Sequence, residues 1–282
     1  YQAVFGRLNY TLADRYIINF TGRRDGSSRF GQGKQFANFG AVGLAWLFYK
    51  NDALTGLQDV LSFGKLRGSF GTSGNDQIGD YQFMDTYTTS GYQYGSVNGL
   101  QPARLYNRDF GWESNTKLEG ALELVFFKDR LFLTAALYRN QSSNQLVGLP
   151  LPGTTGFTSI QANLDATVRN KGFEFTLRTV NVKSPNFEWS TNFNFTSASN
   201  KLVSFPGLEN SGYRNDYVIG QPTTIRKLFH FTGVNSQTGL YEFEDVNGDG
   251  VVTFEDDRET VKDFNPKFYG GLQNQLSYKG LK

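Results

Sequence analysis

The sequence predicts an all-β chain that forms part of a large antiparallel transmembrane β-barrel, with long extracellular loops and short periplasmic turns. Three observations lead to this prediction. Apolar and polar residues alternate with a period of two almost everywhere, and the helical period of about 3.6 residues is almost absent. Many alternating segments are long, whereas strands of soluble sheets average about five or six residues. Short and long connections also follow one another along the chain, as in outer-membrane barrels.

The alternation gives each predicted strand one apolar face and one polar face. In the segment 15–23, Tyr16, Ile18 and Phe20 share one face, and Asn19 and Thr21 lie on the other. A tilted strand needs roughly 9–11 residues to cross a bilayer, and most of these segments are long enough. About ten segments are predicted as strands, near residues 1–12, 14–25, 36–49, 62–73, 115–127, 130–145, 167–182, 186–199, 222–232 and 266–280.

The connections between these segments support a barrel more than a soluble sheet. Tight links are expected at 12–14, 128–129 and 181–186, and long loops at 24–35, 74–114, 146–166 and 200–265. The segment 49–62 lies where a short link is due and is predicted to hold one helical turn. Aromatic residues near strand ends, such as Trp46, Phe126 and Trp189, suit the girdles at the membrane interfaces. A large soluble β-sandwich with an aromatic core remains an alternative.

Composition excludes several function classes. The chain of 282 residues has no cysteine, which excludes disulfides, thiol catalysis and cysteine metal sites. Its net charge is only +2, with 28 basic against 26 acidic residues and no basic run, so no nucleic-acid partner is expected. No apolar run is long enough for a transmembrane helix, and no signal peptide is visible in residues 1–20. The first residues already form a predicted strand, so the chain is expected to be cut from a longer one.

Five stretches carry a resemblance to one family: residues 5–31, 65–83 ("KLRGSFGTSGNDQIGDYQF"), 111–157, 168–177 ("VRNKGFEFTL") with 187–196, and 238–259 with 265–280. Together, and in this order, they resemble the SusC/RagA-like TonB-dependent receptors of the outer membrane of Bacteroidota. The resemblance implies that residues 1–282 are about ten strands of a 22-stranded barrel. The plug, the signal peptide and the closing strands would lie outside this chain.

The resemblance also implies a transporter and not an enzyme. Members of this family import oligosaccharides or peptides across the bacterial outer membrane, often beneath a SusD-like surface lipoprotein. The inner-membrane TonB complex supplies energy through the plug, and the barrel is surrounded by outer-membrane lipid. Two alternatives stay open: a siderophore-type TonB-dependent receptor, and a secreted β-structured adhesin or binding module stapled by calcium.

The loop 200–265 contains "DVNGDGVVTFED", which has the ligand spacing of a calcium loop. No helix is expected on either side and no second copy exists, so a calcium sensor is not indicated. The spacing instead predicts one structural Ca²⁺ that staples the loop, and no organic cofactor is expected. A metal-free turn capped by its own Asp and Asn side chains is the alternative. The predicted ligands are Asp245, Asn247, Asp249, the carbonyl of Val251, Thr253 and Asp256.

The loop 74–114 is rich in aromatic residues, which can stack on sugar rings or anchor a protein partner. The candidate substrate or lipoprotein contacts are Tyr81, Tyr87, Tyr92, Tyr94, Tyr106 and Trp112. No catalytic residue is predicted. Glu119 and Glu123 share one strand face, but they are about 13 Å apart on an extended strand, too far for paired acid–base work.

Overall fold

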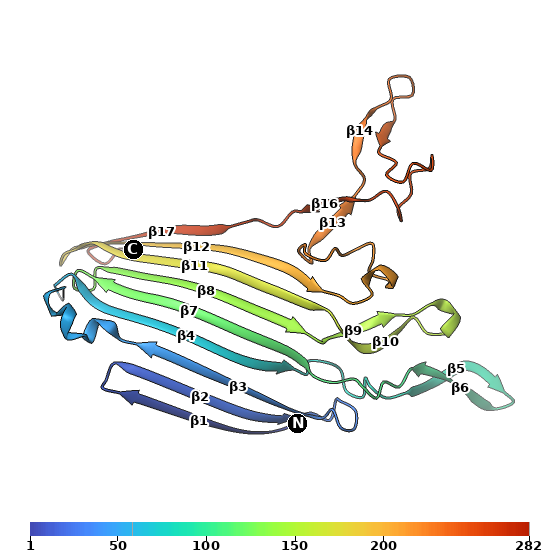
Figure 1. Ribbon diagram of the computed structural model, residues 1–282, viewed down its shortest axis with the longest axis horizontal. Coiled ribbons are helices and arrows are strands. Elements are labelled where there is room, and N and C mark those ends of the chain that lie inside the picture. Colours follow the sequence, from blue (N-terminus) through green and yellow to red (C-terminus); the bar gives the residue numbers. More distant parts are fainter. Residues whose placement is uncertain (58, 282) are drawn as a thin grey trace.

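The computed structural model describes residues 1–57 and 59–281, and its main feature is one nine-stranded sheet (Figure 1). Neighbouring strands pair antiparallel in the order β1-β2-β3-β4-β7-β8-β11-β12-β17. Their bounds are β1 (Gln2–Leu12), β2 (Tyr16–Gly26), β3 (Phe36–Trp46), β4 (Leu61–Asn75), β7 (Glu113–Phe126), β8 (Leu131–Ser143), β11 (Thr167–Lys183), β12 (Phe187–Ser204) and β17 (Tyr269–Tyr278). The expected all-β architecture with long strands is therefore confirmed.

The register between strands brings residues of like polarity into rows. Leu8 lies opposite Phe20, and Phe20 lies opposite Val42 on the next strand. One residue further along, Asn9 lies opposite Asn19. Because side chains alternate between the two sides of a strand, the apolar row faces one side of the sheet and the polar row the other. We call these the outer face and the inner face.

One end of the sheet carries the tight turns. The β1–β2 turn closes with the N–H of Arg15 donating to the carbonyl of Leu12 at 3.1 Å, and Ala13 and Asp14 both have a φ of 50°. Left-handed residues at both central positions are typical of the turn that matches the twist of paired strands. At the same end, the β3–β4 link holds the short helices η1 (Phe48–Lys50) and η2 (Asp52–Leu57), which confirms the predicted helical turn.

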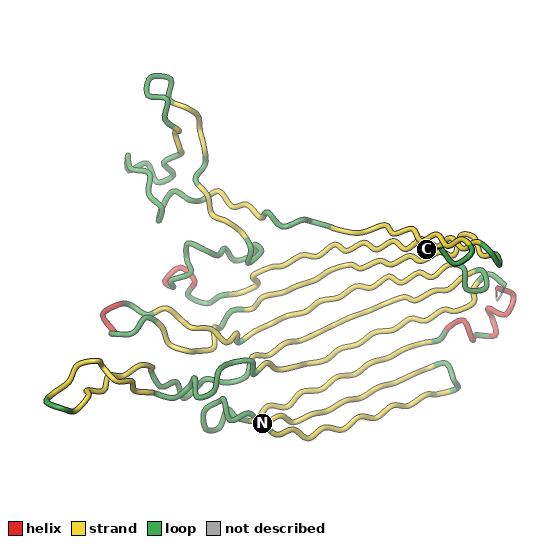
Figure 2. Tube along the Cα trace, turned by 180° about the vertical axis from the view of Figure 1, so that it is seen from behind, coloured by secondary structure: helices red, strands yellow, loops and turns green. Residues whose placement is uncertain are grey.

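The opposite end carries the long connections, and each of three builds its own small hairpins (Figure 2). The links alternate between the two ends of the sheet as expected, although the β3–β4 link (residues 47–60) is longer than the β2–β3 link (residues 27–35), which was expected as a long loop. The hairpins themselves were not predicted: the 74–114 and 146–166 segments were expected as loops without strands. They comprise β5 (Thr86–Tyr94) with β6 (Val97–Arg104), β9 (Gln145–Pro150) with β10 (Ser159–Leu164), β13 (Ile225–Leu228) with β16 (Thr260–Asp263), and β14 (Phe231–Val234) with β15 (Tyr241–Phe243). Helices η3 (Gly153–Thr155) and η4 (Leu208–Asn210) complete these connections.

The prediction of a barrel strand at 222–232, the ninth of the ten segments, is wrong. This segment forms β13 and the start of β14, which pair with β16 and β15 inside the same connection and not with the main sheet. Each of these two strands has four residues, too few to cross a bilayer. Local alternation marks a strand but not its partner, and here the partners are supplied by the loop itself.

The sheet forms a single layer in which the outer face has no protein covering it (Figure 1). Large apolar side chains on this face stay exposed: Leu137 is 64% exposed and Leu272 is 68% exposed. A soluble sandwich would cover such a face with a second sheet. The alternative of a soluble β-sandwich therefore does not describe this fold. Among the described residues, helices are too short and too polar to span a membrane.

The tightly packed regions lie where long connections meet the sheet. Ala166, Leu202, Phe205 and Leu208 form a buried cluster at the ends of β11 and β12. Phe30 is fully enclosed beside Trp112 at the ends of β2 and β7, with ring centroids 5.0 Å apart. The bases of the loops are thus anchored by apolar contacts, whereas the body of the sheet relies on strand pairing.

Two neighbouring glycines in β17 allow a direct test of the β12–β17 pairing. A methyl group on Gly270 would overlap the backbone carbonyl oxygen of Asn194, whereas on Gly271 it would meet only the Asn194 side chain, at 3.5 Å. We expect Gly270→Ala to lower the free energy of unfolding by about 1–3 kcal/mol, because backbone atoms have to move. Gly271→Ala, the matched control, should change it far less. Denaturant unfolding of the full-length receptor in detergent measures both, and equal effects would contradict the register between β12 and β17.

Candidate functional site

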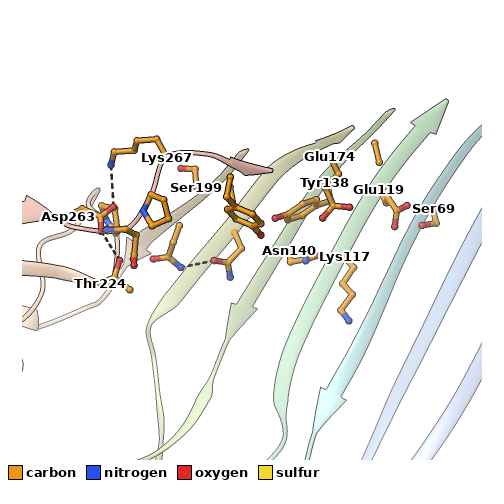
Figure 3. Close-up of a pocket in the computed structure, with 18 residues that line it drawn as sticks. Ser69, Lys117, Glu119, Tyr138, Asn140, Glu174, Ser199, Thr224, Asp263 and Lys267 are labelled. Carbon is orange, nitrogen blue, oxygen red and sulfur yellow. Dashed lines mark hydrogen bonds and ion pairs between the residues drawn. The ribbon is translucent and has the colours of Figure 1, made fainter. Parts of the chain in front are cut away.

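A cavity of about 930 Å³ lies on the inner face, between the strands and the base of the 205–268 connection (Figure 3). Its floor consists of side chains from β4, β7, β8, β11 and β12, and its rim is contributed by the two limbs of that connection. The sequence did not single out this site, although its members occupy the polar positions of the alternation. The polar residues that line it are Ser69, Lys117, Glu119, Tyr138, Asn140, Asn170, Glu174, Ser199, Asn200, Thr224, Asp263, Asn265, Lys267 and Tyr269.

Three asparagines cross the cavity floor in one register row. Asn140 lies opposite Asn170, and Asn170 lies opposite Asn200. The amide of Asn200 donates to Oδ1 of Asn170 at 2.7 Å, and Oδ1 of Asn200 accepts the N–H of Thr223 at 2.7 Å. Each amide carries two donors and one acceptor oxygen, so the row keeps further hydrogen-bonding capacity for a ligand. The amide row therefore offers both donors and acceptors to a polar molecule.

Two charged groups lie beside the amide row. Lys117 lies opposite Asn140 in the same row, and Glu174 lies four positions after Asn170 on β11 and lines the same cavity. Within the described residues, the side chains of Lys117 and Glu174 form no hydrogen bond or ion pair with protein groups. An unpaired cation and an unpaired anion in one cavity can both bind a ligand that carries charges of both signs.

The two glutamates weighed as a possible acid pair are instead held by cations. Arg67 donates from Nη1 to Glu119 and from Nε to Glu123, the latter at 2.7 Å. Lys65 adds a second partner to Glu123, at 3.2 Å. Both carboxylates thus accept charge-assisted hydrogen bonds from cations on the neighbouring strand. Glu119 and Glu123 therefore belong to one ion-pair network on the inner face with Arg67 and Lys65.

The rim of the cavity is closed by Asp263, which ties the two limbs of the connection together. Its Oδ1 accepts the hydroxyl of Thr224 at 3.1 Å and the N–H of Asn265 at 3.2 Å, and its Oδ2 lies 3.3 Å from Nζ of Lys267. The N–H of Asn265, followed by Thr224 and Lys267, holds the pKa of Asp263 below its ordinary value, although partial burial acts in the other direction. The carboxylate stays ionised near neutral pH and fixes the entrance side of the cavity.

The acidic loop 245–257 lies far from this cavity, in the part of the connection that projects beyond the sheet (Figure 1). Both carboxylate oxygens of Asp245 accept backbone N–H groups, from Gly248 and from Gly250, each at 2.7 Å. Gly248 and Gly250 have φ of 73° and 87°, which side-chain-bearing residues rarely adopt. The first half of the predicted ligand set is thus folded into a tight turn with its oxygens directed at the loop backbone.

Asn247 and Asp249, the next predicted ligands, also accept hydrogen bonds from the backbone of the loop. Oδ1 of Asn247 accepts the N–H of Asp249 at 3.0 Å, and Oδ1 of Asp249 accepts the N–H of Val251 at 2.8 Å. Thr253 contacts Asp256 through a long hydrogen bond of 3.4 Å. Across the described part of the chain, no group of three or more acidic or histidine side chains is placed to hold a metal ion. Asp245, Asp249 and Asp256 therefore do not converge on one point, and calcium binding stays a prediction.

Asp257 holds the two ends of the loop together, although the ligand spacing does not single it out. It is fully enclosed, and its carboxylate accepts the N–H of Thr253 at 2.6 Å and the N–H of Val246 at 2.7 Å. The N–H of Thr253 is the largest cause that holds the pKa of Asp257 below its ordinary value, against the opposing effect of enclosure. This carboxylate stabilises the loop above its ordinary pKa, and the contribution is lost as pH falls through the lowered value.

The aromatic residues proposed from the 74–114 segment separate into two groups. Tyr87, Tyr92 and Tyr94 belong to the β5–β6 hairpin that extends beyond the sheet, and Tyr94 is 94% exposed (Figure 1). Trp112 instead packs against Phe30 and donates from Nε1 to the carbonyl of Gln35 at 3.1 Å. Tyr81 is exposed, and Tyr106 is half exposed beside a phenylalanine ring. The structure does not bring the six side chains together, and Trp112 is engaged in packing.

Comparison with known proteins places this fold in one family. Residues 1–277 match the family described as TonB dependent receptor-like, beta-barrel. A TonB-dependent receptor of Formosa agariphila is 30% identical over 99% of this chain and 26% of its own length. The TonB-dependent receptor SusC of Bacteroides thetaiotaomicron is 28% identical over 74% of this chain and 21% of its own length.

A solved structure of the RagAB peptide transporter agrees with the architecture. It superposes with a TM-score of 0.84 and 26% identity, covering 99% of this chain and 32% of that one. The chain thus spans between about a fifth and a third of the length of these proteins. The single open layer of nine long strands is what a portion of a closed barrel would contain. The chain belongs to the TonB-dependent receptor β-barrel family and is similar to its SusC and RagA members.

Proposed function

We propose that this chain is part of an outer-membrane transporter that imports oligosaccharides or peptides, driven by TonB through a plug domain. The observation that carries the proposal is the polar inner-face cavity with unpaired Lys117 and Glu174 inside a sheet whose outer face is apolar. Such a sheet separates a lipid-facing surface from a polar passage. Family members of this kind reside in the outer membrane, and the same location is inferred for this protein. No covalent chemistry on the substrate is proposed.

Peptides and oligosaccharides both fit the chemistry of the cavity. The amide row offers repeated donors and acceptors of the kind that pair with peptide groups or sugar hydroxyls. Lys117 and Glu174 add partners of opposite charge, which a peptide with charged ends or side chains would use and a neutral sugar would not. Charge recognition is therefore the feature that separates the two substrate classes.

Uptake experiments with cavity variants test this function. In a host lacking the receptor and complemented with the full-length gene, we expect Lys117→Gln with Glu174→Gln to lower peptide uptake at least about tenfold, because two charge-assisted contacts are lost. Uptake of neutral oligosaccharides should fall less. Lys128→Gln, at an exposed tight turn, is the matched control and should leave both unchanged. Radiolabelled peptide and oligosaccharide pools provide the measurement.

The outcome also separates the proposed import from other functions. If removal of the receptor affected neither peptide nor oligosaccharide uptake, the proposal would be wrong. A defect confined to growth under iron limitation would instead indicate a siderophore receptor. A protein secreted in soluble form would point to the adhesin.

We further propose that the β5–β6 hairpin contacts a SusD-like lipoprotein. Tyr87, Tyr92 and Tyr94 expose broad aromatic surfaces at the far end of a long connection, and tyrosine is enriched in protein interfaces. Tyr81 at the base of the hairpin is also exposed. These side chains lie on the side of the long loops, which in outer-membrane barrels is the outer surface.

Replacement of these four tyrosines by serine tests the contact. We expect the lipoprotein that co-purifies with the tagged full-length receptor to fall about tenfold or more, since truncating one tyrosine that is a binding hot spot costs about 2 kcal/mol or more. Tyr241→Ser, which removes a tyrosine of similar exposure from the β14–β15 hairpin, is the control. Unchanged lipoprotein recovery in the fourfold variant would contradict the proposed contact.

The acidic loop is proposed to bind one structural Ca²⁺ through Asp245, Asn247, Asp249, the carbonyl of Val251, Thr253 and Asp256. Support comes from the folded turn around Asp245 and from the two left-handed glycines that shape it. The ion would neutralise the acidic side chains and stiffen the projecting connection. Asp257 has a different role, because its carboxylate already holds two backbone N–H groups.

Neighbouring aspartates distinguish metal ligation from loop folding. We expect Asp256→Asn to weaken Ca²⁺ binding at least about tenfold, because a ligand charge is lost. Asp257→Asn should instead speed hydrogen exchange at the amides of Val246 and Thr253 even when a chelator is present. Calorimetric Ca²⁺ titration and hydrogen-exchange mass spectrometry of the full-length receptor measure these effects. No binding by the unaltered protein would leave the metal-free turn as the correct description.

A further inference from the structure

A cluster of four cations interrupts the apolar surface of the outer face. Arg139 lies on β8, Arg169 and Lys171 lie on β11, and Lys201 lies on β12. We call them the basic quartet. All four lie near the end of the sheet that carries the long connections, where β8 leads into the β9–β10 hairpin and β12 into the 205–268 connection.

The register brings the quartet together on adjacent strands. Arg139 lies opposite Lys171, and Arg169 lies opposite Lys201. Directly opposed residues have Cβ atoms about 4.5–5.5 Å apart, so the four side chains start from one compact patch. Their sequence neighbours Asn140 and Asn170 line the inner-face cavity, and alternation therefore sends the quartet to the outer face.

The quartet lacks acidic partners. Among the described residues, none of its members takes part in an ion pair. Its internal contacts run through Gln141, whose Oε1 accepts from Nη2 of Arg139 at 3.2 Å and from Nε of Arg169 at 3.3 Å. Like charges directly opposite each other are destabilising. On the inner face, by contrast, Arg67 and Lys65 are neutralised by glutamates.

Lipid-facing apolar residues border the quartet. Leu137 precedes Arg139 by two positions on the same side of β8, and Phe173 follows Lys171 by two positions on β11. The row that holds Arg139 also continues into Leu118 on β7. All three apolar side chains are exposed on the sheet surface. The quartet thus lies at the boundary of the apolar band, at the level where lipid headgroups begin.

We propose that the basic quartet binds the phosphate groups of a phosphorylated glycolipid headgroup in the outer leaflet. Two guanidiniums oriented by one amide oxygen keep most of their N–H donors, and guanidinium groups bind phosphate oxygens through paired hydrogen bonds. The two lysines add mobile point charges beside them. Negative phosphates would relieve the repulsion within the patch while acyl chains cover Leu137 and Phe173. This site goes beyond import, and it rests on the proposed outer-membrane location.

The test uses the full-length receptor in nanodiscs and two forms of one lipid. Lipid A with its phosphates, and lipid A from which the phosphates have been removed, are titrated while the melting temperature and retained lipid are measured. We expect the phosphorylated form to be retained preferentially. Arg139→Gln with Lys171→Gln should weaken its binding about thirtyfold, since each basic group near an anionic lipid surface contributes about 1 kcal/mol. Lys117→Gln with Lys267→Gln, which removes two lysines that line the cavity and lie away from the quartet, is the control pair.

Several outcomes would overturn the proposal. Equal retention of both lipid forms by the unaltered receptor would mean that the quartet is solvated and does not bind lipid phosphate. This comparison needs no variant. Equal loss in the quartet and control pairs would mean that net charge and not the patch attracts the lipid. If inorganic phosphate raised the melting temperature and the receptor showed no preference for the phosphorylated lipid, the quartet would be a site for free anions and not for a lipid headgroup. Membrane fractionation distinguishes a failure of the lipid-binding proposal from a failure of the proposed import function, because a receptor absent from outer membranes would contradict the import function itself.

Discussion

Strand pairing in register is the constraint on which the rest of this structure depends. A strand in a bilayer has no water to satisfy its N–H and C=O groups, so each group has to find a partner on the neighbouring strand. Because side chains alternate with a period of two, the same pairing assigns every residue to one face. A slip of one residue would place Asn140 and Asn170 on the apolar outer face and Leu137 on the polar inner face. One set of backbone bonds thus sorts the apolar outer face, the inner cavity and the charged patches together.

The strands of the main sheet were largely predictable because alternation is a local property of the chain. Eight of the predicted long segments before residue 200 correspond to β1–β4, β7, β8, β11 and β12 with small shifts at their ends. The segment 222–232 was wrongly predicted as a barrel strand because short strands alternate like long ones. Only its pairing with β15 and β16 shows that it belongs to the connection and not to the main sheet. The β5–β6 and β9–β10 hairpins were missed for a related reason, since their glycines, prolines and polar residues resemble those of open loops.

The functional sites were also predictable only where their residues are close together in the sequence. The acidic loop was found because its ligand spacing is contained within twelve residues, whereas the importance of Asp257 depends on a folded backbone that spacing does not describe. The cavity could not be predicted, because Asn140, Asn170 and Asn200 meet only through the register of three strands. Trp112 was assigned to a binding loop on composition alone, yet it packs beneath that loop against Phe30. Chemistry carried by distant segments becomes visible only once the pairing is known.

The row of asparagines also bears on how a bound molecule would move. Neighbouring strands in a sheet repeat about every 4.8 Å, so a chain lying across the floor meets the same amide group at each step. The row runs across the strands, so a polymer that shifts along it moves sideways over the wall from β8 to β12. Its steps are similar but not identical, because Asn200 already bonds Asn170 and Thr223. The row therefore lets a bound chain shift its position on the floor, with little demand on the identity of any one unit.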